Sequence, residues 1–396
     1  MPEEFDSVVV GAGAVGSAAA YALAKRGRRV LLLEQFELGH GRGSSHGESR
    51  IIRHSYTSAD YASLAPAAFE RWRALERESG ARLLTMTGGI DIGRPENAAM
   101  AACREALAIA EIGSVWLEGE AARAYAPQFA LPEDWAVLWQ SGAGILNAGR
   151  CVRALVAQAI AHGATLQERA RVTAIEPGLR ASLVRFERTG AEAEVRARSV
   201  VVAAGPWASS LLAGLGVERP LRVTHQQVVY YPVESPNLWR PGRCPVYIAH
   251  GRGGFYGFPV CERPGFIKVA IELETEIADP DAPPEQPDQE ALAQLDETVA
   301  RMFRGIRPEP AEVITCRYTE TPDRDFIIDR HTEHPSVVVA SPCSGHGFKF
   351  SITSGELAAE LATTPAGTYE SALWRERFSI HRAETLAGAL ATEWRD

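Results

Sequence analysis

Hydrophobic positions near the start of the chain form a continuous run, followed by a glycine turn and a long apolar stretch. Residues 7–10 (Ser-Val-Val-Val) are typical of a strand that is buried on both faces. They are followed by Gly-Ala-Gly-Ala-Val-Gly and then by an alanine-rich segment that ends near Gly27, which predicts a helix. A second apolar run at 30–34 predicts another strand. The pattern therefore predicts a strand, turn, helix and strand over residues 5–34.

Similar units return later in the chain. Residues 151–162 have the spacing of an amphipathic helix. The run 200–204 predicts a buried strand that ends in a glycine turn before a helix at 208–215. A third buried strand is predicted at 337–340, with a helix after Ser354. One parallel sheet assembled from three separated segments is the expected result.

The segments between these units have a different character. Short β-type runs occur around 84–92, 228–231 and 254–259, and the last is aromatic. A helix is predicted over 288–303, with Asp288 as its N-cap. The sequence thus predicts a mostly β second domain inserted into the first.

We therefore expect an α/β chain with a Rossmann-type nucleotide-binding domain and a mostly antiparallel β domain that binds the substrate. The first domain is predicted over 1–85, 145–215 and 320–396, and the second over 86–144 and 216–319. Binding sites form preferentially at domain interfaces, so the active site is expected where the two domains meet.

The first turn carries a G-x-G-x-x-G motif in the context that gives the motif its meaning. Gly11, Gly13 and Gly16 follow a buried strand and open a helix, and Glu34 ends the next strand. Such glycines let the backbone approach a pyrophosphate, which the helix N-terminus then binds. Glu34 can accept hydrogen bonds from a ribose. The motif predicts a dinucleotide site, and an acid at position 34 disfavours a phosphorylated ribose.

A glycine- and serine-rich loop begins at position 41 and runs into what the pattern predicts to be a short helix. Arg50 and Arg53 are three residues apart, so in a helix they would share one face. Two arginines at the mouth of a dinucleotide site suit a carboxylate, a phosphate or a negatively charged reduced cofactor. The alternative is a solvated basic face.

Lysine is rare in this chain: of 41 Lys and Arg residues, only Lys25, Lys268 and Lys349 are lysine. Where arginine replaces lysine so widely, the surviving lysines mark positions at which arginine does not serve. A buried lysine changes its pKa readily, which suits chemistry. We regard Lys25, at an exposed helix end, as incidental, and Lys268 and Lys349 as candidate functional residues.

Charge and cysteine usage exclude several classes of protein. The net charge of −9 disfavours nucleic acid or an anionic membrane as a partner. The first residues are acidic where a signal peptide would be basic, so we expect a cytoplasmic protein. The six cysteines show neither a C-x-x-C pair nor zinc spacing, so we expect no disulfide framework and no metal site.

Five segments of the chain resemble the monomeric sarcosine oxidase family, which includes N-methyltryptophan oxidase and lies within the D-amino-acid-oxidase-like flavoproteins. The resemblance covers essentially the whole chain. The segments 46–54 (HGESRIIRH) and 344–350 (SGHGFKF) are the most specific, and the other three are 5–13, 256–259 and 326–329.

The resemblance implies FAD as the cofactor, a small secondary amino acid and oxygen as substrates, and a monomeric enzyme that releases hydrogen peroxide. Arg53 and Lys349 would bind the substrate carboxylate, Lys268 would lie where oxygen reacts, and Cys316 would carry the flavin through a thioether. Lys268 would act with Arg50 and His46 in catalysis. Further cofactor contacts are expected from Ser44, Arg50, Gly345, Gly347, Phe348 and Lys349.

The chain departs from the family at one position. The family has a histidine four residues after the oxygen-site lysine, and this chain has Glu272. A carboxylate there would repel a substrate carboxylate and could bind hydroxyls or a cation, as in the similar fructosyl amino acid (Amadori product) oxidases. Glu272 could also be an exposed strand residue without a role. Tyr247 and Tyr256 are predicted walls of the pocket, with core packing as the alternative.

Other classes of function stay open at this point. A nicotinamide dehydrogenase would use the same glycine motif. A flavin dehydrogenase would pass its electrons to a carrier and form little peroxide. A flavin-binding subunit without catalytic activity is the third alternative, and the two candidate lysines argue against it.

Overall fold

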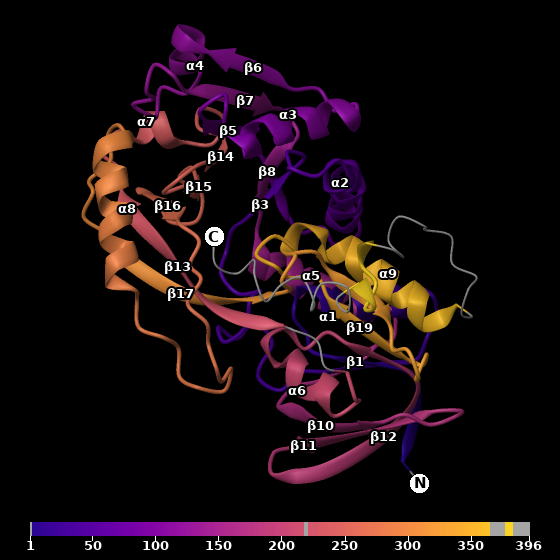
Figure 1. The fold of residues 1–396 in the computed structure, drawn as a ribbon. Coiled ribbons are helices and arrows are strands. Elements are labelled where there is room, and N and C mark those ends of the chain that lie inside the picture. The colour runs from indigo at the N-terminus through magenta and orange to yellow at the C-terminus, as the bar shows by residue number, and fades with distance from the viewer. Residues whose placement is uncertain (1, 218–220, 365–376, 383–396) are drawn as a thin grey trace.

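The computed structural model describes residues 2–217, 221–364 and 377–382. Two large sheets and one small sheet organise the chain. In Figure 1 the first sheet lies at the lower right with helices α1 (Ala14–Lys25), α5 (Ala148–Ala161) and α9 (Ser351–Thr363). The second sheet lies toward the upper left with α8 (Gln289–Met302). The mixed α/β architecture expected from the sequence is confirmed.

The first sheet has a parallel core with antiparallel strands beside it. Its parallel order is β19-β12-β1-β2-β9, and β10, β11 and β18 pair antiparallel. The strands are β1 (Glu3–Val10), β2 (Val30–Leu33), β9 (Thr165–Gln167), β10 (Ala170–Glu176), β11 (Ser182–Arg188), β12 (Ala191–Val202), β18 (Ile327–Arg330) and β19 (Val337–Ser341). The three buried runs of the sequence are thus β1, β12 and β19, paired side by side.

Both faces of this sheet are covered, which explains the continuous apolar runs. Successive side chains of a strand point to opposite faces. Val9 accordingly packs into the core beneath α1, α5 and α9, whereas Val8 and Val10 pack into the core on the other face. A strand that is buried on both faces cannot alternate with polar residues.

Further helices complete the first region. They are α2 (Ala59–Ser79), the short 3₁₀ turn η1 (Gly205–Trp207), α6 (Ala208–Ala213) and a second 3₁₀ turn, η2 (Phe348–Phe350). Helix α9 begins at Ser351, whereas the sequence placed the helix after Ser354. Gly355 of α9 lies against Ala18 of α1, where a Cβ would approach the Ala18 Cβ to 2.5 Å. The glycine therefore permits close packing of the two helices.

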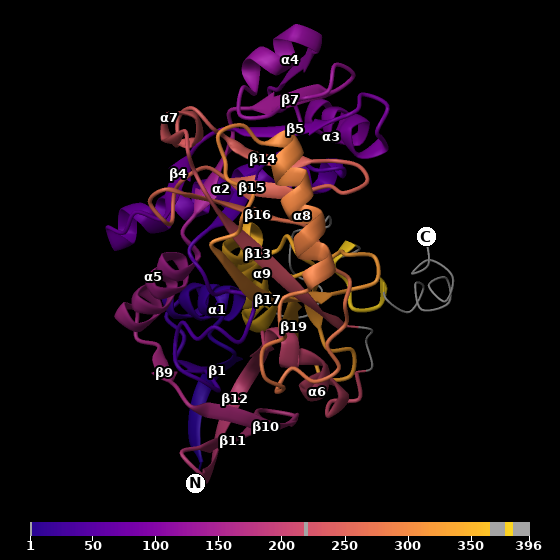
Figure 2. The same ribbon diagram turned by 90° about the vertical axis from the view of Figure 1, so that its left-hand side faces the viewer.

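The second sheet is antiparallel except where β14 pairs with β5, and its order is β17-β13-β16-β15-β14-β5-β7-β6. Its strands are β5 (Gly89–Gly93), β6 (Val115–Glu118), β7 (Ala136–Gln140), β13 (Arg222–Pro232), β14 (Val246–Ala249), β15 (Tyr256–Phe258), β16 (Phe266–Ala270) and β17 (Glu312–Glu320). Helix α8 begins after Asp288, whose side chain accepts from the Ala291 N–H as predicted, and it lies across this sheet (Figure 2). Helices α3 (Ala98–Ile109), α4 (Gly119–Tyr125) and α7 (Pro236–Trp239) lie around its far end.

The third sheet corrects the prediction of a helix at the two arginines. Residues 50–53 form strand β3 (Arg50–Arg53), which pairs with β8 (Ala143–Leu146), and β8 pairs with β4 (Leu84–Met86). The central Ile51 and Ile52 are β-branched and favour a strand once a partner edge is present. Residues three apart on a strand point to opposite faces, so the two arginines do not share one.

The proposed bounds of the two domains stay a prediction, although the strands of the two large sheets separate along the same lines. Part of the predicted first domain, residues 365–376 and 383–396, lies outside the described residues. Among the described helices, none has the length and apolar content needed to cross a bilayer.

Candidate active site

One cavity of about 1400 Å³ runs between the sheets and collects nearly all of the predicted site residues. Its wall includes Gly11 beside β1, Arg53 of β3 and Lys268 of β16, so all three sheets contribute. Of the predicted residues, only Gly16 and Tyr247 do not line it. Most of the predicted residues therefore lie on the wall of one cavity.

The glycine turn forms the end of the cavity beside α1. Gly11 has a φ of 99°, and a Cβ there would lie 2.5 Å from the Ala203 carbonyl oxygen. A Cβ on Gly16 would lie 1.9 Å from the Gly11 carbonyl oxygen. Gly16 thus acts by allowing the turn to close on α1, although it does not line the cavity. Gly13 is the N-cap of α1.

Glu34 provides a buried anion at this end. Its side chain accepts from the Ala12 N–H at 2.8 Å and the Phe36 N–H at 3.0 Å, and it lies 3.3 Å from His40 Nε2. Burial alone would raise the pKa of Glu34, but His40 and the two backbone donors outweigh burial and lower it. Glu34 therefore stays ionised.

The residues present fit a dinucleotide. The glycine turn leaves the backbone open beside the N-terminus of α1, and Glu34 stands beyond it as an acceptor. His46 also lines the cavity, and its Nε2 is buried without a hydrogen-bond partner among the described residues. Burial, Arg50 and Lys268 lower the pKa of His46 to about 4, so the imidazole is neutral near pH 7. A buried polar atom without a partner that faces a cavity indicates a ligand.

Arg50 holds the loop that surrounds the cavity. Its guanidinium donates to the carbonyl oxygens of Ser44 at 2.9 Å, His46 at 2.8 Å and Ser49 at 2.8 Å. It also lies over the ring of Phe348, 5.6 Å from its centre. Arg50 therefore connects two of the predicted cofactor-binding segments, 44–49 and 345–349.

Lys268 is buried and lines the cavity, so it is not an exposed lysine at the edge of a sheet. Its Nζ donates to Ser49 Oγ at 2.8 Å and to Glu262 Oε1 at 3.2 Å. Burial lowers the pKa of Lys268, and Glu262 opposes this effect. Glu262 Oε2 also accepts from the Tyr230 hydroxyl at 2.5 Å. Glu262, which the Tyr230 hydroxyl holds in place, thus stabilises the charged form of Lys268.

Arg53 and Lys349 bring two positive charges together over one aromatic ring. The Arg53 guanidinium lies 4.6 Å and Lys349 Nζ 5.3 Å from the centre of the Tyr56 ring. Lys349 donates to the Tyr56 hydroxyl at 2.7 Å and to the His346 carbonyl at 2.9 Å, and no ion pair is found for it among the described residues. Burial and the charge of Arg53 hold the pKa of Lys349 well below its ordinary value. Arg53 and Lys349 are adjacent and have few negatively charged partners, so together they form a site for an anion.

Asp91 of β5 is the acid nearest to Arg53, at 3.7 Å. The His250 Nε2 lies 2.8 Å from the same Asp91 oxygen, and the thiol of Cys103 is close enough to complete a cluster of three possible metal ligands. The guanidinium of Arg53 already supplies positive charge to Asp91, so the cluster does not require a metal ion. No motif in the sequence had indicated that Asp91, Cys103 and His250 lie together.

Strand β17 places two further side chains in the cavity. Cys316 and Tyr318 are two residues apart and so point to the same face, and both line the cavity. Burial raises the pKa of the Cys316 thiol, while Arg50 and Lys268 oppose this effect. The hydroxyl groups of Tyr318 and Tyr256 lie 3.1 Å apart. Tyr256 therefore lies on the wall, as predicted.

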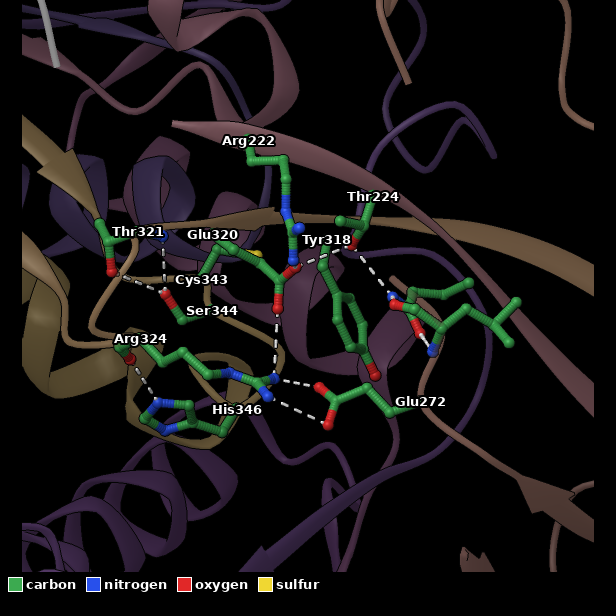
Figure 3. Close-up of polar contacts among 12 residues, drawn as sticks. Arg222, Thr224, Glu272, Tyr318, Glu320, Thr321, Arg324, Cys343, Ser344 and His346 are labelled. Atoms are coloured by element: carbon green, nitrogen blue, oxygen red, sulfur yellow. Dashed lines mark hydrogen bonds and ion pairs between the residues drawn. The ribbon is translucent and has the colours of Figure 1, made fainter. Parts of the chain in front are cut away.

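Glu272 lines the cavity but is not a free carboxylate. Figure 3 shows its two oxygens facing the guanidinium of Arg324, which also reaches Glu320. Glu272 is half-exposed and lies just after β16, and its role stays a prediction.

Tyr247 corrects the prediction of a second tyrosine wall. It is fully buried in the core of the second sheet, among Phe129, Trp239 and Phe303. It lies on β14 beside Ile248, and Ile248 is the residue that lines the cavity. Adjacent strand residues point to opposite faces, so only one of the two can reach the cavity.

Sequence reasoning missed four residues that complete the site: Glu262, Tyr56, Tyr318 and Arg324. Tyr318 had a signal, because it stands two positions after Cys316 and would share its face on a strand. Tyr56 stands three positions after Arg53, directly behind a specific motif. Glu262 and Arg324 lie in turns, where no periodicity marks a side chain that points inward.

Comparisons with known proteins agree with this geometry. Residues 6–361 match the family model described as DAO, FAD dependent oxidoreductase. The chain is 34% identical over 385 residues to the peroxisomal sarcosine oxidase of Homo sapiens, covering 94% of this chain and 95% of the relative. It is 32% identical over 389 residues to the monomeric sarcosine oxidase of a Bacillus species, with 96% and 98% covered.

Solved structures show the same fold. NikD, described as an unusual amino acid oxidase essential for nikkomycin biosynthesis, superposes with a TM-score of 0.83 at 27% identity and covers 95% of this chain and 97% of its own. Amadoriase I, a fructosyl amine oxidoreductase from Aspergillus fumigatus, has a TM-score of 0.76 at 21% identity, with 100% and 94% covered. The second likeness concerns the fold alone.

Proposed function

The chain belongs to the DAO family of FAD-dependent oxidoreductases, and we propose that it is an oxidase of small secondary amino acids, whose nitrogen carries a methyl group or belongs to a ring. The observation that carries this proposal is the pair of cations, Arg53 and Lys349, over Tyr56. Relatives named sarcosine oxidase support the same class of substrate.

The two cations bind the carboxylate of the amino acid. Arg53 offers a planar fork of donors and Lys349 a point charge, and the low dielectric of the buried site strengthens both interactions. Tyr56 holds Lys349 through its hydroxyl, and Ser55 and Asp91 hold Arg53. Fixed donors place the C–N bond of the substrate in one orientation, which removes much of the entropic cost of reaction.

The chemistry that FAD supplies when bound is acceptance of a hydride from the carbon beside nitrogen and transfer of two electrons to oxygen. The substrate loses a hydride from carbon and a proton from nitrogen to become an imine. Oxygen takes up the two electrons and two protons to become hydrogen peroxide, and water then hydrolyses the imine. Tyr256 and Tyr318 line the space beside the substrate.

Lys268 supports the assignment as an oxidase. A fixed cation in a site without bulk water stabilises negative charge that develops on oxygen. Ser49 and Glu262 hold Lys268 by hydrogen bonds, so the charge needs no rearrangement during reaction. A carrier-linked dehydrogenase and a subunit without activity have no need of this cation.

We further propose that FAD is attached covalently through the sulfur of Cys316. The thiol lines the cavity and lies near Arg50 and Lys268, which favour its thiolate. Yellow colour that stays with the protein after denaturation and precipitation would support the bond, and Cys316→Ala should release the flavin. Flavin release from the unaltered chain would contradict it.

We further propose that the protein is a cytoplasmic monomer. The name of the monomeric relative supports the oligomeric state. Light scattering of the purified protein measures it.

The first experiment is anaerobic bleaching of the flavin by sarcosine, N-methyltryptophan, pipecolate, proline and fructosyl-glycine, followed by air and a peroxide assay. Fast bleaching by an N-methyl or cyclic amino acid, with peroxide on reoxidation, is the expected result. No bleaching by any of the five would rule out the substrate class. Bleaching without peroxide would indicate a dehydrogenase.

Bleaching by the fructosyl compound alone would indicate an Amadori product oxidase. The structure gives this alternative little support, because both oxygens of Glu272 are already bound by Arg324. A free carboxylate for sugar hydroxyls is therefore missing at that position.

A further inference from the structure

Glu272 and Arg324 form a two-point ion pair between segments that are far apart in the sequence. Glu272 follows β16, and Arg324 lies in the turn between β17 and β18. Arg324 Nη1 donates to Glu272 Oε2 at 3.1 Å, and Nη2 donates to Oε1 (Figure 3). Planar pairing of this kind fixes geometry as well as charge.

The pair belongs to a network whose charges balance. Arg324 Nη2 lies 3.2 Å from Glu320 Oε1. Glu320 is buried, and its Oε2 accepts from Thr224 at 3.0 Å and lies 3.5 Å from Arg222. Burial disfavours the charge of Arg324, but Glu272 and Glu320 outweigh burial and raise its pKa. Two arginines and two glutamates leave no net charge.

The pair lies where the cavity reaches solvent. Glu272 and Arg324 both line the cavity, yet their side chains are 44% and 46% exposed. His346 connects Arg324 to the anion site. Its Nε2 lies 3.0 Å from the Arg324 carbonyl oxygen, and its own carbonyl accepts a hydrogen bond from Lys349. The groups of a substrate farthest from its carboxylate would therefore meet this pair.

We propose that the Glu272–Arg324 ion pair determines substrate specificity by excluding amino acids with a charged side chain, whichever sign that charge has. The inference rests on the proposed function, because it takes the carboxylate to be bound at Arg53 and Lys349.

The physical reason is that each member of the pair cancels the other. A second carboxylate on the substrate is attracted by Arg324 and repelled by Glu272, and a substrate cation meets the reverse. A charged group that enters this half-exposed position gives up part of its hydration without gaining a net partner, whereas a neutral group loses little. Specificity of this kind comes from a cost imposed on the wrong substrate.

Removing one member of the pair should therefore admit substrates whose side chain carries one sign of charge. Glu272→Gln leaves Arg324 to attract anions, so the ratio of kcat/KM for N-methylaspartate to that for N-methylasparagine should rise. Arg324→Gln leaves Glu272 to attract cations, so the ratio for N-methyllysine to N-methylnorleucine should rise. Each rise should be up to about fivefold, the effect of one partly exposed ion pair.

Two controls separate the proposal from a general effect of charge. The double variant Glu272→Gln, Arg324→Gln restores neutrality, so neither ratio should rise as far as in the single variants. Glu356 pairs with Arg71 at similar exposure but outside the cavity, so Glu356→Gln should leave both ratios unchanged. Failure of either single variant to raise its ratio overturns the proposal.

The same four compounds distinguish failure of this inference from failure of the proposed function. If the unaltered enzyme oxidises none of them, the dissociation constants from anaerobic changes in flavin absorbance give the same two ratios without turnover. Unchanged ratios together with normal oxidation contradict the inference alone. Absent oxidation with shifted binding ratios contradicts the function alone.

Discussion

At the scale of single residues, the charge of Lys268 should affect reoxidation of the flavin by oxygen but not its reduction by the substrate. Replacing it in Lys268→Met removes the cation but not the anion site, so anaerobic bleaching by substrate should persist. The reaction of the reduced enzyme with oxygen should slow by on the order of 100-fold, as for loss of other preorganised electrostatic contacts. Stopped-flow reoxidation measures the effect.

Lys25 provides a matched control for this variant. It lies at the end of α1 and pairs with Glu78, with half of its side chain exposed. Lys25→Met should reoxidise at the normal rate. Reoxidation at the normal rate in Lys268→Met would remove oxygen activation from the role of Lys268.

The lowered pKa of Lys349 gives carboxylate binding a predictable dependence on pH. Only the cation attracts a carboxylate, so affinity should be full below the pKa of Lys349 and should fall as pH rises through it. Above that point, Kd should rise by up to about tenfold per pH unit, because binding must take up one proton. Cyclopentanecarboxylate, which keeps the ring and acid of proline but lacks its amine, can be titrated by flavin absorbance.

The neighbours of Lys349 make this assignment testable. Burial lowers the pKa of His346 and raises that of Tyr56, which separates both titrations from that of Lys349. Lys349→Met should therefore bind the ligand more weakly at low pH and lose the fall in affinity. The same fall in Lys349→Met would assign the titration to another group.

The sequence predicted those site residues that a short motif or a rare residue type marks. The glycines, Glu34 and the two lysines stand in short motifs or are conspicuous by their rarity, and all but Gly16 line the cavity. Glu262 and Arg324 could not be found in this way, because their partners Tyr230 and Glu272 lie in other segments. A pairing that tertiary structure creates leaves no spacing in the sequence.

At the scale of elements, the glycine turn before α1 sets how closely the helix approaches its strand. A Cβ on Gly16 would lie 1.9 Å from the Gly11 carbonyl oxygen, and the backbone must move to admit it. Gly16→Ala should therefore lower the free energy of unfolding by at least about 2 kcal/mol, a typical effect of overpacking. Chemical unfolding and the flavin content of the purified protein measure the two consequences.

Gly113 is the control, because it is exposed and a Cβ there would meet no atom within 4 Å. Gly113→Ala should change neither quantity appreciably. Equal stability of the two variants would show that the turn at α1 can relax, and the argument for close approach would fail.

Strands whose apolar pattern results from burial on both faces were predicted well. A segment whose conformation depends on pairing with a distant strand was not. The runs that became β1, β12 and β19 are apolar because both of their faces are covered. The segment 50–53 has arginines at both ends and isoleucines between, which fits a helix or a strand equally. Pairing with β8, about 90 residues away, decided between them.

At the scale of the whole molecule, an acidic segment joins the two halves of the cavity wall. Asp281 lies between β16 and α8, in the part of the chain that builds the second sheet. Its two oxygens accept from Trp207 Nε1 at 2.7 Å and Arg171 Nη2 at 3.0 Å, in the region of the first sheet. Arg317 donates to the carbonyl oxygens of Pro280 and Ala282 and so holds the segment from β17. Residues 279–281 themselves line the cavity.

Asp281→Ala should therefore loosen the closure of the cavity more than it destabilises the fold. The lost contacts are partly exposed, so the free energy of unfolding should fall by only about 1 kcal/mol. Access of solvent should increase, and iodide should quench the flavin fluorescence more strongly than in the unaltered protein. Glu176→Gln breaks a pair with Arg185 inside the first sheet and should leave quenching unchanged. Equal quenching in both variants would mean that other contacts hold the two regions together, with Asp281 contributing only to local stability.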